Sequence, residues 1–378
     1  MVYEIIVLLL TASYILFFLL YLFGWIMLPV FRQAEFAPQT KVSIIVPARN
    51  EEKSISRLLN CLLTQSYPDS LYEIIIVDDF SEDNTLQVIK SFDSFKIKLL
   101  QLKDFISNEE RIMSFKKKAI EVAVTNSTGE LIVTTDADCR MNENWLKTLV
   151  NFYEIQKCRM IVAPVLINEE KGFFAKFQSL DLIGLMGITG ATLQIKFPTM
   201  CNGANLAFGR KSFYEVNGYA DISEKSSGDD MLLMHKMGKK WPGAVKFIRN
   251  TNAIVYTSPQ KTLSSFIAQR MRWTSKSQAY SDWKIKMNLL LIYLFNLSLP
   301  VACFLSILMG KLWLMFFFQL AVKLILDFVF LSQVTEFFNR RRLLWLFLPV
   351  EAAHIIYIVV VGFAGNFFQS TWKGRKVK

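Results

Sequence analysis

The sequence contains few cysteines, and their spacing does not define a site. Five are scattered over 378 residues without a CxxC pair: Cys61, Cys139, Cys158, Cys201 and Cys303. This spacing argues against a disulfide framework or a zinc site and predicts free thiols in a reducing compartment. The chain also lacks a recognisable signature of DNA or RNA binding, so no nucleic acid is expected as a partner.

Acidic residues are in short supply relative to basic ones, and the formal net charge is +11. Hydrophobic residues make up 52% of the chain, with the excess concentrated at its two ends. This composition is too apolar for an ordinary soluble enzyme. Beside long apolar runs, the positive charge indicates attraction to anionic lipid headgroups and phosphorylated substrates. The length suggests two domains, or one domain and a membrane part.

An almost uncharged apolar run covers residues 5–30, and about 20 such residues suffice to cross a bilayer. The run lacks the basic start and short apolar core of a cleaved signal peptide. We therefore expect a retained transmembrane anchor over residues 1–31. Because Arg32 and Lys41 follow the run while only Glu4 precedes it, the N-terminus should lie outside and residue 32 onward in the cytoplasm.

The C-terminal part, residues 287–368, is apolar again, and a basic tail follows over residues 369–378. Three further spans are predicted, near 288–309, 312–333 and 343–366. We thus expect a multi-pass protein of the cytoplasmic (inner) membrane. Three full crossings would place the basic tail outside, against the positive-inside rule. Either the tail lies outside or one apolar segment is re-entrant.

Charged residues fall inside these spans at the spacings of helical pairs. Lys323 and Asp327 are four apart and can pair on one helix face, which lowers the cost of carrying them in lipid. Glu351 and His354 are three apart. They either pair with each other on one helix face or face a lipid headgroup.

Residues 41–286 alternate strand and helix patterns. Buried strands are predicted at Val42–Val46, Ile74–Val77, Lys96–Leu102 and Leu131–Thr135. Strands alternating with helices at this spacing predict a mostly parallel sheet with both faces covered. Polar side chains at the carboxyl ends of such strands line the ligand crevice. Those expected there are Asn50, Asp78, Asp79, Asp136 and Asp138.

Asp136 and Asp138 directly follow a buried strand, in the stretch VTTDADCR. Two carboxylates this close repel each other unless a cation lies beside them. A hard divalent ion suits them, since Mg²⁺ commonly takes one or two carboxylates plus substrate phosphates. The alternative interpretation is a solvated Asp-x-Asp turn.

Other charged pieces also allow two interpretations. Asp78-Asp79 either caps a helix or accepts hydrogen bonds from a base or a ribose. Asp229-Asp230 starts a helix, where one carboxylate can serve as a cap and the other as a base aimed at a hydroxyl. Lys116–Lys118 opens a helix, where cations are unfavourable, and this indicates an anion nearby.

Two segments are predicted to be interfacial helices. Residues 172–197 are apolar but interrupted by charges, which suggests a helix at the membrane surface or lining an acceptor groove; the alternative is a plain buried helix. Residues 260–286 contain Gln269, Arg272 and Trp273, spaced to share one helix face. A guanidinium suits phosphate oxygens, and an indole suits a sugar or a membrane interface.

Several short pieces occur in an order and spacing typical of one family: VSIIVPARNEE, IIIVDDFSEDNT, KKKAI, TTDADC, CNGANLAF, SGDD and QRMRW. Residues 41–286 thereby resemble the family 2 glycosyltransferases, in particular their membrane-anchored, cellulose-synthase-like branch. The resemblance implies an α/β fold of the GT-A type. This is a nucleotide-sugar-binding domain with a mostly parallel mixed sheet, joined here to N- and C-terminal transmembrane helices.

The resemblance also implies a donor and metal site. Donor binding, with uridine as the implied base, falls to Pro47, Ala48, Arg49, Asn50, Glu51, Asp78, Asp79, Lys116, Asp136, Ala137, Asp138, Gln269 and Arg272. Asp136 and Asp138 match the family's Asp-x-Asp motif and would hold Mn²⁺ or Mg²⁺, with Asp138 as the direct ligand.

Catalytic and acceptor roles follow in the same way. Asp230 matches the general base of the family, with Asp229 in place of its usual glutamate, and Arg272 would steady the diphosphate. Acceptor contacts are implied for Cys201, Asn202, Gly203 and Trp273. The expected reaction is an inverting transfer of a sugar to a lipid or lipid-linked acceptor at the cytoplasmic face.

Three alternatives remain open at this point. A processive polysaccharide synthase usually carries more helices than about four. A catalytically silent membrane scaffold would keep the fold, but such a protein is expected to lose Asp138 or Asp230, and this chain has both. A nucleotidyltransferase gives no role to residues 269–273.

Overall fold

The computed structural model describes residues 2–34, 37–106, 114–168, 171–220, 228–275, 280, 282–310, 312–367, 370–372 and 375–377. Ser227 of the SGDD piece, and Lys373 and Lys378 of the basic tail, lie outside the described residues. The chain divides into two compact units. The helical unit contains Met1–Met27, Glu170–Thr192 and Gln260–Ser370, and the sheet unit contains Leu28–Glu169, Leu193–Pro259 and Thr371–Lys378.

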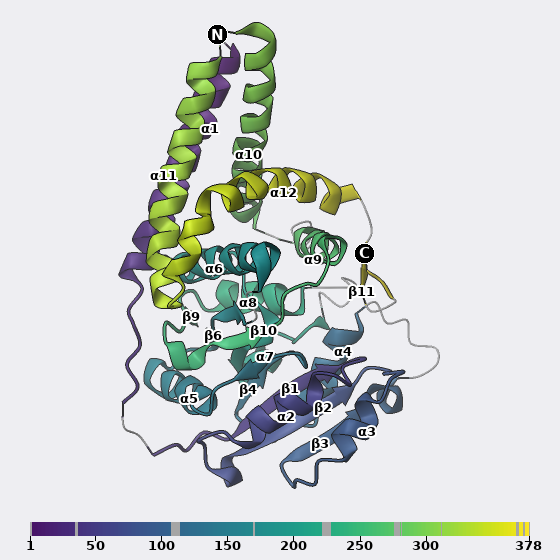
Figure 1. The fold of residues 1–378 in the computed structure, drawn as a ribbon. Coiled ribbons are helices and arrows are strands. Elements are labelled where there is room, and N and C mark those ends of the chain that lie inside the picture. The colour runs from purple at the N-terminus through teal and green to yellow at the C-terminus, as the bar shows by residue number, and fades with distance from the viewer. Residues whose placement is uncertain are drawn as a thin grey trace. The chain divides into compact units, whose positions relative to one another are not determined.

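The sheet unit is built on a seven-stranded mixed sheet (Figure 1). In spatial order its strands are β3 (Ile97–Gln101), β2 (Tyr72–Asp78), β1 (Val42–Ala48), β4 (Leu131–Thr134), β8 (Leu206–Gly209), β6 (Met160–Val162) and β9 (Val245–Phe247). β1 pairs in parallel with β2 and β4, and β2 with β3, whereas β8 runs antiparallel to β4 and β6. The expected mostly parallel mixed sheet is confirmed.

The central strands are apolar along their length because both faces of the sheet are covered. Every residue of β4 is buried, and in β1 only Pro47 is half-buried. Helix α4 (Phe115–Thr125) packs on β1 and β2. Helix α2 (Ile55–Leu63) buries the face formed by Ile55, Leu58, Leu59 and Leu62, as its helical spacing predicts.

Shorter elements complete the sheet unit. The helices are η1 (Asp69–Leu71), α3 (Thr85–Lys90), η2 (Leu102–Phe105), α5 (Trp145–Gln156), η3 (Gly203–Asn205), α7 (Arg210–Glu215), α8 (Asp229–Lys240) and η5 (Thr251–Ala253). A second sheet has the order β5 (Arg140–Met141), β10 (Val255–Thr257) and β7 (Val165–Ile167). β11 (Ser370–Trp372) and β12 (Arg375–Val377) form a separate pair at the chain end.

Asn205 ties the two larger sheets together. Its amide nitrogen donates to the carbonyls of Pro164 and Ala253, both at 2.8 Å, and its side-chain oxygen accepts from the indole of Trp145 at 3.1 Å. Both N–H groups of the Asn205 amide are therefore used inside the fold. No disulfide joins the five cysteines, all of which the structure describes, and this confirms the predicted thiols.

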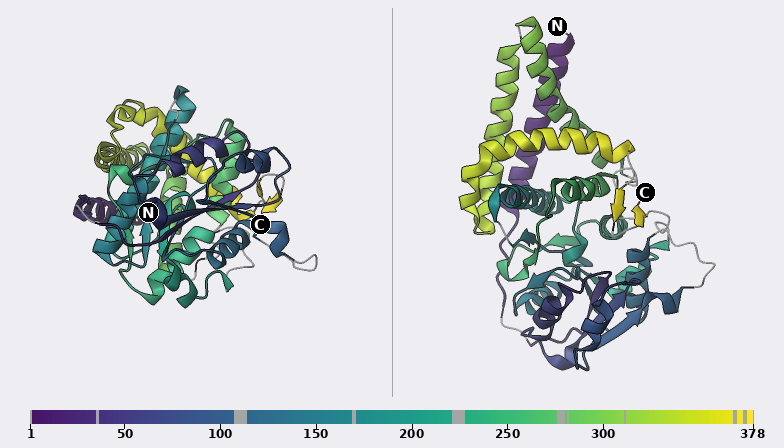
Figure 2. Two further views of the ribbon diagram at one scale, coloured as in Figure 1. Left: turned by 90° about the horizontal axis from the view of Figure 1, so that it is seen from below. Right: turned by 45° about the vertical axis from the view of Figure 1, so that its right-hand side comes forward.

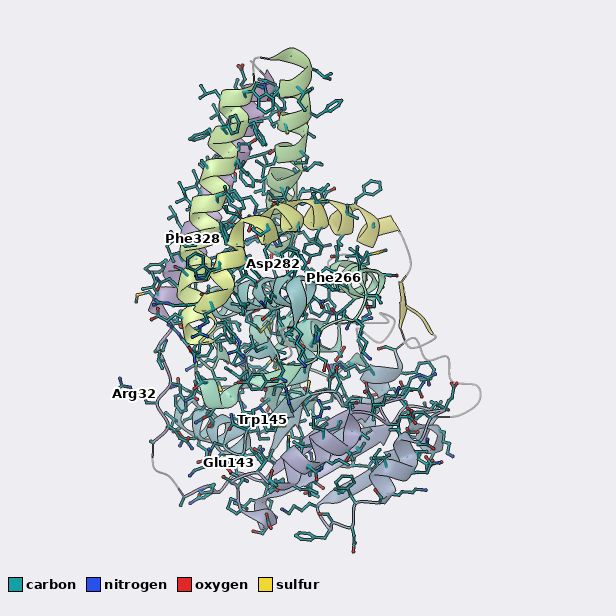
Figure 3. The ribbon with its side chains drawn as sticks, viewed as in Figure 1. Arg32, Glu143, Trp145, Phe266, Asp282 and Phe328 are labelled. Atoms are coloured by element: carbon teal, nitrogen blue, oxygen red, sulfur yellow. The ribbon has the colours of Figure 1, made fainter. Side chains whose placement is uncertain are left out.

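The helical unit contains the long apolar helices. They are α1 (Val2–Met27), α10 (Trp283–Met309), α11 (Trp313–Phe337) and, after η7 (Arg341–Leu346), α12 (Phe347–Phe367). Within the described residues, four segments are long and apolar enough to cross a membrane, and these are the four predicted spans. Large apolar side chains stand outward along them and are exposed, as Figure 3 shows for Phe328.

The helices of this unit do not all run in one direction. α1, α10 and α11 lie side by side, whereas α12 runs across their axis (Figures 1 and 2). α6 (Gly172–Gln194) and α9 (Leu263–Ser275) also lie across the end of this bundle at which α1 ends and α10 begins. The two segments predicted to be interfacial therefore fold with the apolar helices, and α6 is buried along most of its length.

Lys323 and Asp327 are paired on α11, as predicted. Lys323 Nζ lies 2.7 Å from Asp327 Oδ2 on the same helix and 2.8 Å from Glu351 Oε1 on α12. The Tyr14 hydroxyl of α1 donates to Asp327 Oδ1 at 2.5 Å. One buried cluster thus joins α1, α11 and α12, which goes beyond the pairs within single helices that the spacing predicted.

Candidate active site

Asp136 and Asp138 lie in a turn at the carboxyl end of β4. The turn is closed by the backbone N–H of Cys139, which donates to the carbonyl of Asp136 at 3.1 Å. The Asp136 side chain is 37% exposed, and Asp138 belongs to the exposed residues. The hydroxyl of Thr257 on β10 donates to Asp138 Oδ2 at 3.3 Å. A rigid strand end and a neighbouring strand therefore hold the two carboxylates.

Lys116 connects this turn to a second pair of carboxylates. From the first turn of α4, its Nζ lies 2.7 Å from Asp136 Oδ1 and 3.6 Å from Asp229 Oδ2. Burial alone would lower the pKa of Lys116, but the carboxylates of Asp136, Asp229 and Asp230 outweigh it and hold that pKa well above its ordinary value. The anion that the position of this lysine predicted is therefore supplied by the protein itself.

Asp229 and Asp230 begin α8, after Gly228, which occupies the left-handed region at φ 88°. Both carboxylates are buried. Asp230 accepts hydrogen bonds on both oxygens, from the N–H of Gly203 at 3.1 Å and from the N–H of Met231 at 2.7 Å. These backbone donors fix the direction of the Asp230 carboxylate.

Gly203 is the point where this carboxylate pair meets the central sheet. A Cβ at this position would lie 3.3 Å from Asp229 Oδ2 and 3.4 Å from Asp230 Cβ, so a side chain has little room. The Gly203 carbonyl accepts from the hydroxyl of Thr134, the last residue of β4, at 3.0 Å. The loop therefore carries α8 against the same strand end that positions Asp136.

The loop after β1 is joined to the loop after β2 by hydrogen bonds and an ion pair. The buried guanidinium of Arg49 donates to the carbonyls of Asp79 and Phe80 at 2.9 and 2.7 Å and pairs with Glu82 at 3.1 Å. Asn50, at φ 51°, accepts from the N–H of Glu82 at 2.9 Å. These contacts tie the loops after β1 and β2 together.

Asp78, the last residue of β2, keeps one oxygen unsatisfied. Its carboxylate is buried, and Oδ2 accepts from the N–H of Ser81 at 3.4 Å. Oδ1 has no hydrogen-bond partner among the described residues. A buried acceptor without a partner is unfavourable by roughly 1–3 kcal/mol, so this oxygen is suited to a donor group on a ligand. Asp79 beside it is also buried.

The other predicted contacts differ in exposure. Ala137 and Cys201 are buried, whereas Asn202 is half-buried and its side chain accepts from the N–H of Ala204 at 3.0 Å. Glu51 bonds to Thr85 through its N–H at 2.7 Å and contacts Ser54 through its carboxylate. Their donor or acceptor roles stay predictions.

Gln269, Arg272 and Trp273 lie on α9 and are half-buried. They belong to the helical unit, whereas the carboxylates, Lys116 and the residues after β1 and β2 belong to the sheet unit. Within the sheet unit, Lys116 joins Asp136 to Asp229, and Arg49 joins the loops after β1 and β2. The contribution of α9 stays a prediction.

Sequence reasoning missed two residues beside the carboxylates. Thr257 bonds to Asp138, and Tyr219 is buried near Asp229 and Asp230. Burial raises the pKa of the Tyr219 phenol well above its ordinary value, and the two carboxylates raise it further. Neither residue belongs to a recognisable motif, so only the fold reveals them.

The carboxylates of Asp136 and Asp138 suit a divalent ion that is bound jointly by the protein and a phosphate ligand. In the described part of the chain, no group of three or more His, Cys, Asp or Glu side chains gathers around a possible metal position. Asp136 and Asp138 nevertheless supply carboxylate oxygens, which Mg²⁺ and Mn²⁺ prefer. Because Mg²⁺ commonly takes only one or two carboxylates beside substrate phosphates, this set of donors fits an ion that binds together with a phosphate ligand.

Two family models match the chain. Glycosyl transferase family 2 matches residues 43–216, and Glycosyl transferase family group 2 matches residues 131–364, more than half of the chain. Both matches include the turn with Asp136 and Asp138, and the second also includes Asp230 and α9.

Similar proteins match over part of their length. The poly(ribitol-phosphate) beta-N-acetylglucosaminyltransferase TarS of Staphylococcus aureus is 34% identical over 115 residues, 30% of this chain and 19% of the relative. The beta-monoglucosyldiacylglycerol synthase of Trichormus variabilis is 27% identical over 146 residues, 37% of this chain and 30% of the relative. The chain thus spans less than a third of the length of either relative.

A solved structure resembles nearly the whole chain. The mannosyltransferase PcManGT from Pyrobaculum calidifontis, in complex with GDP-Man and Mn²⁺, has a TM-score of 0.59 and 17% sequence identity, covering 97% of this chain and 99% of that chain. At this identity the likeness concerns the fold alone, and it confirms the expected GT-A type.

Proposed function

The chain belongs to the family 2 glycosyltransferases, and we propose that it transfers a sugar from a nucleotide-sugar donor to a lipid or lipid-linked acceptor. One observation carries this proposal. Lys116 bridges Asp136 at the end of β4 and Asp229 at the start of α8, so the carboxylates suited to a metal and those suited to a base share one cluster.

Asp230 acts as the general base. An acceptor hydroxyl attacks the anomeric carbon, the bond from that carbon to the diphosphate oxygen breaks, and the hydroxyl proton passes to the Asp230 carboxylate. The backbone N–H groups of Gly203 and Met231 donate to the Asp230 carboxylate and keep it oriented. As donors they do not compete with it for the hydroxyl proton. A single displacement of this kind inverts the anomeric centre.

The donor binds along the carboxyl ends of β1, β2 and β4. The unsatisfied oxygen of Asp78 accepts a hydrogen bond from the base, for which uracil is proposed. Asp136 and Asp138 would hold Mg²⁺ or Mn²⁺, which when bound neutralises charge on the departing diphosphate. Gln269 and Arg272 are proposed to assist at the diphosphate, since a guanidinium matches phosphate oxygens.

The acceptor is proposed to be a lipid because the helical unit is built for a membrane. Its described residues include four helices long and apolar enough to cross a membrane, and one relative is named as a beta-monoglucosyldiacylglycerol synthase. Trp273 and the loop of Cys201, Asn202 and Gly203 are proposed to contact this acceptor. About four helices are few for a channel that would export a polymer, so one or a few transfers are favoured over processive synthesis.

The membrane is proposed to be the cytoplasmic one, with the sheet unit on its inner side. The crosswise course of α12 supports three crossings, by α1, α10 and α11, and an α12 that stays at the inner surface. This arrangement returns Arg340–Arg342 and the basic tail to the cytoplasm, in accord with the positive-inside rule. It resolves the conflict in charge that three C-terminal crossings would create.

Labelling of introduced cysteines tests this topology. In a background in which the native cysteines are replaced by serine, Lys376→Cys should react with a membrane-impermeant maleimide only after the cells are opened. Met309→Cys, at the last residue of α10, should react in intact cells. Reaction of Lys376→Cys in intact cells would show that α12 crosses the membrane.

Release of nucleoside diphosphate tests the activity. Purified full-length protein is incubated with UDP- and GDP-sugars, Mg²⁺ or Mn²⁺, and a membrane lipid extract, and the products are analysed by mass spectrometry. Lipid-dependent release of UDP with a glycosylated lipid is expected. Release of pyrophosphate would instead support a nucleotidyltransferase, and no turnover of any donor would support a silent scaffold.

A further inference from the structure

Helix α9, which carries Gln269, Arg272 and Trp273, is held from one side by α6. In the segment just before α9 begins, Gln178 of α6 donates to the carbonyl of Gln260 at 3.0 Å, and the N–H of Gln260 donates back at 2.8 Å. One turn further along α6, Asp181 Oδ2 lies 2.5 Å from Arg270 Nη2. Gln178 and Asp181 are three apart and share one face of α6, so a single face contacts both α9 and the segment just before it.

Aromatic packing fills the space between these two contacts. The ring of Phe266 on α9, labelled in Figure 3, lies 5.7 Å from the rings of both Phe174 and Phe177 of α6. It also lies 5.4 Å from the ring of Tyr357 on α12. Phe266 is fully buried, so α9 is anchored in an apolar socket made by two other helices.

α12 holds α9 from a second side at close range. A Cβ at Gly365 would lie 2.9 Å from the Cβ of Thr274 and 3.3 Å from the carbonyl oxygen of Met271. The two helices can approach this closely only because position 365 has no side chain. α9 therefore has little freedom to slide against α12.

A buried ion pair between Asp181 of α6 and Arg270 of α9 restrains the rotation of α9 about its own axis. The Asp181–Arg270 pair is sealed from water, with both side chains at most 4% exposed. The other oxygen of Asp181 lies 3.7 Å from His354 Nε2, and His354 Nδ1 lies 3.6 Å from Glu351, the partner of Lys323. Asp181 thus links α9 to the buried cluster of the apolar helices.

Arg270 passes this constraint on to Trp273. Its guanidinium carbon lies 4.2 Å from the centre of the Trp273 ring and 4.8 Å from that of Phe266. A cation over an aromatic face orients that ring. Gln269 and Arg272 flank Arg270 in the sequence, so their directions change together with any rotation of α9.

We propose that Asp181 is a positioning residue that, through Arg270, sets the rotation of α9 and thereby the presentation of Gln269, Arg272 and Trp273. The inference rests on the proposed function in assigning these three residues to donor and acceptor. Asp181 itself touches neither. Since a misplacement of about 1 Å lowers turnover by roughly 100-fold, loss of this pair should impair kcat.

The test compares Asp181→Asn with a matched substitution elsewhere in the helical unit. Asp327→Asn removes an equally buried carboxylate that contacts Lys323 and Tyr14 and has no contact with α9 among those described. Both variants should lose thermal stability. Only Asp181→Asn should lower kcat by about 10- to 100-fold, while Asp327→Asn should keep kcat within about twofold. Asp181→Glu should recover part of kcat.

Hydrogen exchange of the backbone amides of residues 263–275 gives a readout that does not depend on turnover. Faster exchange in α9 is expected for Asp181→Asn and Arg270→Gln, and less so for Arg270→Lys. Unchanged exchange in Asp181→Asn would overturn the proposal, as would equal losses of kcat in Asp181→Asn and Asp327→Asn. A wild-type protein that turns over no donor would overturn the proposed function instead, and the exchange experiment would still decide whether Asp181 holds α9.

Discussion

Each of the two units contains a lysine held between two carboxylates, and the two lysines differ in exposure. In the sheet unit, Lys116 Nζ lies 2.7 Å from Asp136 and 3.6 Å from Asp229, and its side chain is 26% exposed. In the helical unit, Lys323 Nζ lies 2.7 Å from Asp327 and 2.8 Å from Glu351, and its side chain is 1% exposed. The same ionic arrangement occurs once in reach of water and once sealed from it.

This difference in exposure distinguishes a cluster that can bind a ligand from a cluster that stabilises the fold. Lys116 and the 37% exposed Asp136 form a pair in reach of water, where ion pairs are worth about 0–1 kcal/mol, so this contact can be exchanged for a charged ligand at little cost. Removing one partner of a sealed pair costs about 3–5 kcal/mol because the other charge stays buried. The cluster of Lys116 is therefore suited to ligand exchange, and the cluster of Lys323 to holding α1, α11 and α12 together.

The largest effect is expected in the sheet unit and on chemistry rather than on folding. Asp230→Asn keeps the shape of the side chain but removes its ability to accept a proton, so kcat should fall by about 10²- to 10⁴-fold. Donor affinity, measured by titration with the nucleotide sugar, should be unchanged. A variant that keeps wild-type turnover would remove Asp230 as the base.

Removing each lysine tests whether exposure determines how much each cluster contributes to stability. Lys323→Met leaves Asp327 and Glu351 buried without their cation, so the free energy of unfolding in detergent should fall by about 3–5 kcal/mol. Lys116→Met, its matched control, should lower it by less, because Asp136 stays in reach of water and only Asp229 is left buried without its cation. Equal losses in the two variants would mean that exposure does not distinguish the clusters.

A smaller, graded effect is expected at the proposed metal ligands. Asp138→Ala should abolish the difference in donor affinity between buffers with and without Mn²⁺. Thr257→Val removes only the hydroxyl that orients Asp138, and metal affinity should weaken by about tenfold. Calorimetric titration with Mn²⁺ and nucleotide measures both. A wild-type protein that binds donor equally well without metal would contradict this assignment.

The first strands along the chain and the positions of the carboxylates in the sequence could be predicted because they depend on local patterns. The strands at Val42–Ala48 and Leu131–Thr134 are short apolar runs, and polar residues follow them directly. The carboxyl ends of parallel strands meet at one edge of a sheet, so the convergence of Asp78 and Asp136 was expected. Four apolar helices could be counted from length and hydropathy alone.

The partners of these residues could not be predicted, since they come from distant segments. Nothing local to Lys116 indicates Asp229, and nothing local to Asp138 indicates Thr257. Arg49 was assigned to the donor from its motif, yet in the structure it also bonds to the loop after β2. Hydropathy likewise does not distinguish α12, which runs crosswise, from the helices that run side by side.

The sequence by itself determined the class of the fold, the apolar helices and the kinds of chemistry that the side chains can perform, because periodicity, length and residue type are local properties. Tertiary structure alone decided which lysine stays in reach of water, which aspartate holds α9, and which glycine lets α8 meet the sheet. These outcomes depend on how tightly distant segments pack and how much water remains between them, and packing of that kind is a property of the whole fold.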